Sequence, residues 1–97
     1  WPDYVFEDDY NLMSIKELLE FIKVNGHLPN IPSAEIVEKE GFYLGDLNSK
    51  LLQKIEELTL YTIEQDSTLT DYKARLEKLE KENIEFKKIL AELISTK

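Results

Sequence analysis

The sequence of 97 residues contains no cysteine, only three glycines and three prolines, and a single histidine. Without cysteine, neither disulfides nor thiolate zinc sites can stabilise the fold. Three scattered glycines exclude a glycine-rich phosphate-binding loop. No apolar run approaches the roughly 18 residues that cross a bilayer, so the sequence predicts no membrane span.

Basic residues are also scarce, with 12 Lys and Arg against 20 Asp and Glu, for a net charge of −8. Nucleic-acid binding depends largely on contacts between basic side chains and phosphates. Anionic membrane surfaces attract clusters of basic residues in the same way. The charge therefore excludes nucleic acid as a partner and argues against a membrane surface.

Residues that could carry chemistry have no partners at suitable spacing. His27 is isolated, and the acidic run Glu7–Asp9 lacks the spacing of a calcium loop. No nearby His or Lys would activate the serines at positions 14, 33, 49 and 67. Ser14 and Ser33 are explained as helix caps. We therefore expect no catalytic residue, no metal, no cofactor and no enzymatic activity.

The chain has the size of one small domain, and it begins without Met, which indicates a piece of a longer protein. A capping box at Ser14–Glu17 predicts a helix over 14–25, which Gly26 ends. Ser33 predicts a second, short helix through Lys39. Residues 1–12 alternate in a way that suits an extended segment.

From residue 44 to the carboxy terminus the pattern is helical with a repeat of seven. Steps of four and three residues give alternating a and d positions, of which ten of thirteen are apolar or aromatic: Leu51, Ile55, Leu58, Thr62, Gln65, Leu69, Tyr72, Leu76, Leu79, Asn83, Phe86, Leu90 and Leu93. We call these residues the seam, with Ile55 at a. The unbroken phase predicts a left-handed coiled coil and makes a lone amphipathic helix a weak alternative.

The charges beside the seam favour parallel chains in register. In that arrangement a g residue faces the e residue five positions later on the next chain. Arg75 then faces Glu80, and Glu82 faces Lys87, so both predicted interchain ion pairs are attractive. Exposed pairs of this kind select orientation more than they stabilise.

The number of chains and the continuity of the helix are less constrained. Asn83 at an a position fixes register and by itself favours a dimer, whereas Thr62 and Gln65 suit a wider, three-stranded core. Residues 65–71 are poor helix formers and could cap a new helix at Thr68. Because the heptad phase does not jump there, we expect one continuous helix.

The sequence thus predicts an all-α fold in two parts. Residues 1–43 form a head with an extended amino-terminal segment and two short helices, and residues 44–97 form a long helix in a parallel coiled coil. The start of the long helix is apolar beyond the seam: Leu44, Leu47, Leu51, Leu52, Ile55 and Leu58. The expected cover comes from the short helices: Ile15, Leu18, Leu19, Ile22, Ile36 and Val37.

Several segments resemble one known family. The sequences WPDYVF (1–6), NGHLPNIPSA (25–34), LGDLN (44–48) and LLQKIEELTLY (51–61) are similar to a carboxy-terminal module of large, tail-fibre-like surface proteins of Bacteroidetes. The resemblance covers about residues 1–65. It implies a fibre or adhesin-like parent at the cell surface or outside the cell, with chains joined as a trimer, and it implies no enzymatic activity.

The leading hypothesis is therefore a module that oligomerises and registers the chains of a surface fibre, as a parallel homotrimer or alternatively a dimer. A second hypothesis is an intramolecular chaperone or an export signal, which is either retained or removed after assembly. It would present Leu60, Tyr61 and Ile63 to a secretion machine. A third is a tip that binds a surface ligand through the amino-terminal aromatics and the turn at 27–33.

Overall fold

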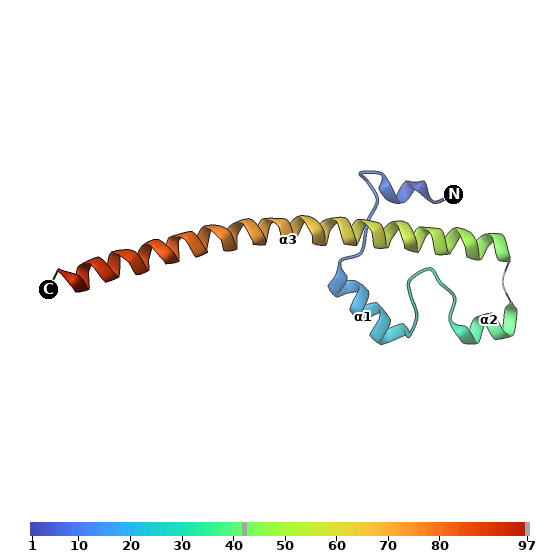
Figure 1. Ribbon diagram of the computed structural model, residues 1–97. Helices are drawn as coiled ribbons and strands as arrows, with labels where there is room; N and C mark the ends of the chain where they lie inside the picture. Colours follow the sequence, from blue (N-terminus) through green and yellow to red (C-terminus); the bar gives the residue numbers. More distant parts are fainter. Residues whose placement is uncertain (42, 97) are drawn as a thin grey trace. The chain divides into compact units, whose positions relative to one another are not determined.

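The computed structural model describes residues 1–41 and 43–96, and its described secondary structure is helical (Figure 1). The elements are a short 3₁₀ helix η1 (Asp3–Phe6), α1 (Ile15–Asn25), α2 (Ala34–Glu40) and α3 (Leu44–Ser95). The predicted order of two short helices and one long helix is confirmed. Phe42 and Lys97, which fall inside the two predicted ranges, lie outside the described residues.

Local capping explains the bounds of α1. The Ser14 hydroxyl accepts a hydrogen bond from the Glu17 amide at 3.1 Å. It also donates to the Glu17 carboxylate at 2.9 Å, where the capping box predicts a bond from the Ser14 amide instead. Gly26 ends the helix in the left-handed conformation, with φ of 73°. Both predicted ends of α1 are thus within one residue of the observed ends.

The short helix α2 is bounded in the same way. The Ser33 hydroxyl accepts from the Ile36 amide at 3.3 Å, and the Gly41 amide donates to the Val37 carbonyl. Gly41 has φ of 72° and ψ of −164°, a backbone region open almost only to glycine. The chain therefore leaves α2 through a conformation that glycine adopts because it has no side chain.

The amino-terminal segment is not extended throughout, and the prediction is wrong at residues 3–6. Asp3–Phe6 form η1, in which the Val5 amide donates to the Pro2 carbonyl at 3.1 Å. With about three residues per turn, Pro2 and Val5 share one face. Both are fully buried. The apolar contact of this face with the rest of the fold outweighs the local alternation of residues 4–6.

The long helix α3 spans 52 residues without a break, so the predicted continuity through Ser67 is confirmed. Its composition explains this, because Leu, Glu and Lys are its commonest residues and no proline follows residue 32. No helix in the described part of the chain is long and apolar enough to cross a membrane.

The described chain forms two compact units, residues 1–61 and residues 62–97. The predicted boundary at 43/44 coincides with the start of α3. The first compact unit reaches further, because the first 18 residues of α3 pack with the head.

Candidate oligomerisation surface

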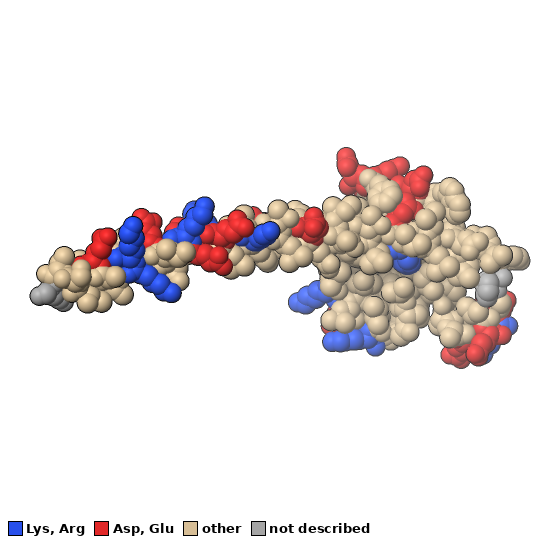
Figure 2. Space-filling view, in the orientation of Figure 1, with Lys and Arg blue, Asp and Glu red and all other residues tan. Residues whose placement is uncertain are grey.

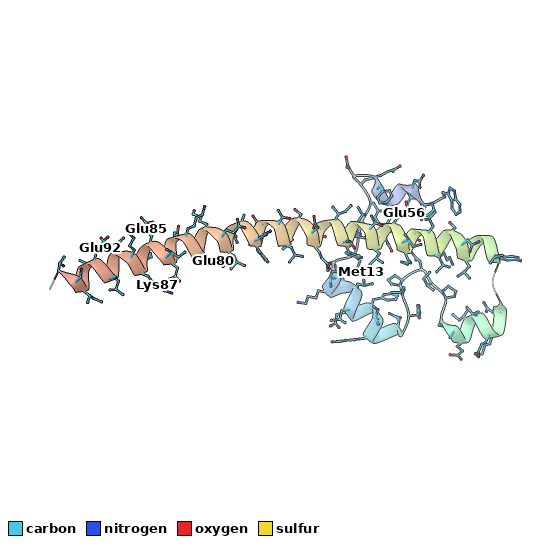
Figure 3. All side chains as sticks on the ribbon, viewed as in Figure 1. Met13, Glu56, Glu80, Glu85, Lys87 and Glu92 are labelled. Atoms are coloured by element: carbon cyan, nitrogen blue, oxygen red, sulfur yellow. The ribbon has the colours of Figure 1, made fainter. Side chains whose placement is uncertain are left out.

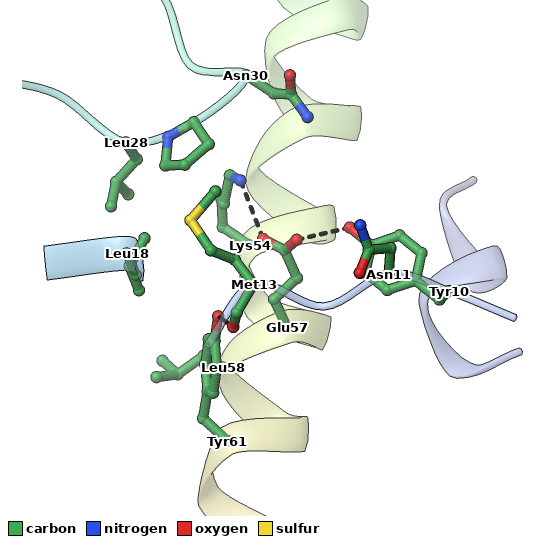
Figure 4. A pocket seen from close by; sticks show the side chains of 11 residues that line it. Tyr10, Asn11, Met13, Leu18, Leu28, Asn30, Lys54, Glu57, Leu58 and Tyr61 are labelled. Carbon is green, nitrogen blue, oxygen red and sulfur yellow. Dashed lines mark hydrogen bonds and ion pairs between the residues drawn. The ribbon is translucent and has the colours of Figure 1, made fainter. Parts of the chain in front are cut away.

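The amino-terminal residues 1–13, which we call the arm, are held to α3 by polar side chains. The Tyr10 hydroxyl donates to the Glu57 carboxylate at 2.6 Å and accepts from the Gln53 amide at 3.1 Å. Lys54 lies 2.9 Å from the other oxygen of Glu57, and both side chains of this pair are mostly buried (Figure 4). The network joins residues 43 to 47 positions apart in the sequence, so it fixes the arm on the helix.

A second link attaches the carboxy-terminal end of the arm to α3. The Tyr61 hydroxyl donates to the Met13 carbonyl at 2.5 Å. The Tyr10 ring also lies 5.9 Å from that of Tyr4. Burial, and then the bond to Glu57, raise the pKa of Tyr10 above its ordinary value of 10.0. Tyr10 therefore stays a neutral donor at physiological pH.

Glu56 lies beneath η1 (Figure 3) and is only 6% exposed, and neither of its carboxylate oxygens has a hydrogen-bond partner within the described chain. Burial raises its pKa, and the nearby Asp3 carboxylate raises it further, while the amino group of Trp1 acts in the opposite direction. With Ile55 at a, Glu56 occupies an outer b position, where a charged residue is normally solvated. Its burial is the most unexpected feature of the site.

The arm covers one side of α3. Position letters follow from Ile55 at a, so Gln53 and Leu60 are f residues and Glu56 is a b residue. Gln53 and Glu56 are buried and Leu60 is half-buried, all on the side of the helix away from the seam. Figure 1 shows η1 on one side of this part of α3, and α1 and α2 on the other.

The helices α1 and α2 flank α3 on its c and g side. A cavity of about 300 Å³ lies between Leu18 of α1, Leu28 of the connector, and Glu57, Leu58 and Tyr61 of α3 (Figure 4). The helix α2 borders α3 in the same way, across a second hollow that is lined partly by Ile36 and Leu47. The head therefore reaches the edge of the seam at Leu58 without crossing it.

The connector between α1 and α2 is a tight turn. The Ile31 amide donates to the Leu28 carbonyl at 3.2 Å, and Asn30 has φ of 63°. Proline followed by a residue with positive φ is the pattern of a type II turn. Nδ1 of His27 lies 2.9 Å from the Leu28 carbonyl, and its ring packs edge-on to Phe21. His27 therefore contacts the turn and α1.

The face of α3 that carries the seam stays open in the first compact unit. The exposed fractions of Leu51, Ile55 and Leu58 are 47%, 59% and 63%. The predicted cover by the short helices is only partial, because Leu47, Leu52, Leu18 and Val37 are half-buried. Four residues expected to provide cover remain largely exposed themselves: Ile15, Leu19, Ile22 and Ile36. Folding of one chain thus hides the outer sides of the helix and leaves its a and d positions exposed, while the e residue Leu52 is half-buried.

The rest of the seam lies on α3 in the second compact unit and is exposed in the single chain: Thr62, Gln65, Leu69, Tyr72, Leu76, Leu79, Asn83, Phe86, Leu90 and Leu93. The predicted ion-pair residues Arg75, Glu80, Glu82 and Lys87 are exposed too. Within the helix, Arg75 lies 3.9 Å from Asp71. Acidic and basic side chains alternate along this unit, with uncharged surface between them (Figure 2).

The docking surface of the chaperone hypothesis is reduced in the structure. Leu60 and Tyr61 are half-buried by the head, and of the three residues only Ile63 is exposed. Among residues 1–41 and 43–96, no group of three or more His, Asp or Glu side chains is arranged to hold a metal. Comparisons with protein-family models, with curated proteins and with solved structures found no match.

Proposed function

We propose that this chain is a non-enzymatic module that joins three copies of one polypeptide, in parallel and in register, in a fibre or adhesin-like protein at the cell surface. The seam residues hold the chains together, and the head forms a collar around the start of the coiled coil. The surface location rests on the resemblance of residues 1–65 to tail-fibre-like proteins.

The observation that carries the proposal is that the head covers some sides of α3 and leaves the seam exposed. The arm and the short helices occupy its b, c, f and g sides, while Leu51, Ile55 and Leu58 stay exposed. An apolar stripe that begins in the head and continues over six heptads is costly to leave in water, at roughly 25 cal/mol for each Å². A second and third copy remove this cost without displacing the head.

The side positions support parallel register along the helix. Besides the two charged pairs, a parallel in-register arrangement brings Leu47 at g opposite Leu52 at e. Near the carboxy terminus it brings Ile89 opposite Ile94 in the same way. An antiparallel arrangement would instead place g residues opposite g residues and would separate these matched pairs.

The apolar pairs at both ends also favour three chains over two. The g and e positions become more enclosed as strands are added, so apolar residues there gain more in a trimer than in a dimer. Thr62 and Gln65 at the centre of the interface are accommodated by a wider core. Asn83 sets the register, at a cost in stability.

The direct test is the mass of the intact chain in solution by light scattering. A parallel trimer has three times the 11.4 kDa of one chain, and this mass should persist at micromolar concentration. A monomer under those conditions would overturn the proposal, and a dimer would overturn its stoichiometry.

A matched pair of variants locates the interface. Leu76→Glu introduces a charge at an a position and should dissociate the assembly, because an unpaired buried charge costs about 3–5 kcal/mol. Ala74→Glu introduces the same side chain at an outer f position and should leave the mass unchanged. Equal behaviour of the two variants would show that the seam is not the interface.

A further inference from the structure

The first compact unit buries too little apolar surface to be complete. Among its described residues, Val5 and Pro2 are the fully buried apolar side chains. Small folds with such limited cores usually need disulfides, metals or association. This chain has no cysteine, and its described part holds no metal-ligating cluster. Association is the remaining source of burial for the head itself.

The helix α1 presents the surface that lacks cover. Ile15, Leu19 and Ile22 are 53%, 50% and 39% exposed. They lie at helical spacing on one face that is continuous with Leu18, which packs towards α3 beside Leu58. The apolar face of α1 therefore extends beyond its own contact with α3, next to a cavity of about 300 Å³ that is open to solvent.

The position of α1 on α3 determines what can reach this face. Leu18 lies near Tyr61, a g residue, and Leu58, a d residue. In a parallel coiled coil the g side of one chain is adjacent to the e side of the next. A second copy would thus bring its e residues, of which Thr59 is at the same level, towards the exposed face of α1.

The charges along the e positions match this geometry. The e residues inside the first compact unit, Leu52 and Thr59, are uncharged. The next four e residues, which lie beyond the head, are charged: Asp66, Lys73, Glu80 and Lys87. The last e residue, Ile94, is apolar and lies near the carboxy terminus. An uncharged surface is the counterpart that an apolar helix face requires, and Leu52 and Thr59 give the e side of α3 such a surface at the level of the head.

We propose that α1 is an interchain clamp, in which Ile15, Leu19 and Ile22 of one copy pack on the e side of α3 of the next copy around Thr59 and close the cavity beside Leu58. This inference rests on the proposed parallel assembly and names a second interface in it. Both the head and the seam then contribute to the choice of partner.

Disulfide trapping tests the clamp, because the chain contains no cysteine of its own. Leu19→Cys and Thr59→Cys are made in separate chains of different tag length, mixed, refolded together and oxidised. A disulfide between them can then form only between two copies. Ile15→Cys with Thr59→Cys provides a second pair, in case one substitution perturbs α1.

The control for geometry is Glu20→Cys, which lies on a different face of α1 and is exposed. The clamp predicts about tenfold more mixed disulfide for Leu19 with Thr59 than for Glu20 with Thr59, since two cysteines bridge only when their Cα atoms are within about 7 Å. Equal yields, or no product for the Leu19 and Ile15 pairs, would overturn the clamp.

The control for assembly is Leu79→Cys, at a d position. In a parallel register this cysteine should form a disulfide with Cys at the same position of another copy, whether or not α1 contacts that copy. A Leu79 disulfide without any from Leu19 or Ile15 would refute the clamp and leave the proposed function intact. Absence of the Leu79 disulfide together with a monomer mass would refute both.

Discussion

At the scale of single residues, Glu56 is the side chain whose environment departs furthest from its position in the heptad pattern. Its carboxylate lies beneath η1, without a hydrogen-bond partner in the described chain and close to the like charge of Asp3. A buried charge without compensation destabilises the state that buries it. The arm is therefore held by Tyr10 and Val5 against an opposing contribution from Glu56.

Replacing this carboxylate should tighten the arm. Glu56→Gln is expected to raise the thermal midpoint of unfolding by several degrees at pH 7, as measured by circular dichroism. Because folding raises the pKa of Glu56, its favourable contribution is complete only below the ordinary value of 4.5 and is lost as pH rises through the higher folded pKa. The parent should thus gain stability on acidification towards that value, and the variant should gain less.

The matched control is Glu77→Gln, which makes the same change at an exposed b position. Its midpoint and pH dependence should stay close to those of the parent. Indistinguishable results for positions 56 and 77 would contradict the burial of Glu56.

At the scale of secondary-structure elements, local chemistry was sufficient to predict the helices. Ser14 and Ser33 cap α1 and α2, Gly26 and Gly41 end them, and α3 begins at Leu44, where the helical pattern starts. Each of these features depends on contacts between residues at most four positions apart. Short-range signals of this kind are visible in a sequence without any knowledge of the fold.

The position of the arm could not be predicted, because it depends on contacts between residues far apart in the sequence. Its 3₁₀ helix is selected by the burial of Val5, and its attachment depends on Tyr10 meeting Glu57, 47 residues away. The heptad pattern predicts which face of α3 is apolar, but it contains no information about which outer side a polar segment will cover. Aromatic residues ahead of the first cap were the one available indication.

The stretch 65–71 of α3 is helical but composed of weak helix formers. Ser67→Ala with Thr70→Ala changes two outer positions and should add about 1 kcal/mol of helix stability per chain, from about 0.5 kcal/mol at each site. Amide hydrogen exchange should show slower exchange at residues 65–71 in this variant, with the largest change near the substitutions.

Lys81→Ala serves as the control, because it also lies at an outer position and Lys is nearly as good a helix former as Ala. It should leave exchange at 65–71 unchanged. Comparable slowing in both variants would mean that propensity does not limit this part of the helix.

At the scale of the whole molecule, charge is distributed unevenly between the two units. Residues 1–61 contain five lysines against twelve Asp and Glu, a net charge of −7, whereas residues 62–97 carry only −1. Three copies in register would gather three strongly acidic heads around one axis. Their repulsion opposes assembly at the head, where the apolar contacts must therefore be strong enough to overcome it.

Salt should consequently stabilise the assembly. Between about 0.02 M and 0.5 M NaCl the screening length falls from roughly 20 Å to roughly 4 Å, so the repulsion between heads largely disappears. The midpoint of thermal unfolding, followed at constant protein concentration, is expected to rise over this range. A fall would mean that the ion pairs beside the seam dominate.

Neutralising the exposed turn in the arm with Glu7→Gln, Asp8→Asn and Asp9→Asn should weaken this salt dependence. The same number of charges removed from the second unit, with Glu77→Gln, Glu85→Gln and Glu92→Gln, should leave it largely in place. Equal effects of the two triple variants would contradict an origin in the heads.

The backbone around the glycines has a consequence for how such sequences can diverge. Gly41 adopts a conformation that side chains essentially prevent, so this position should remain glycine in any relative that keeps the fold. Gly26 is left-handed near the region that asparagine tolerates, so the two residues should alternate there. Gly45 lies in α3 with open space where a methyl group would stand, so alanine should replace it freely during evolution.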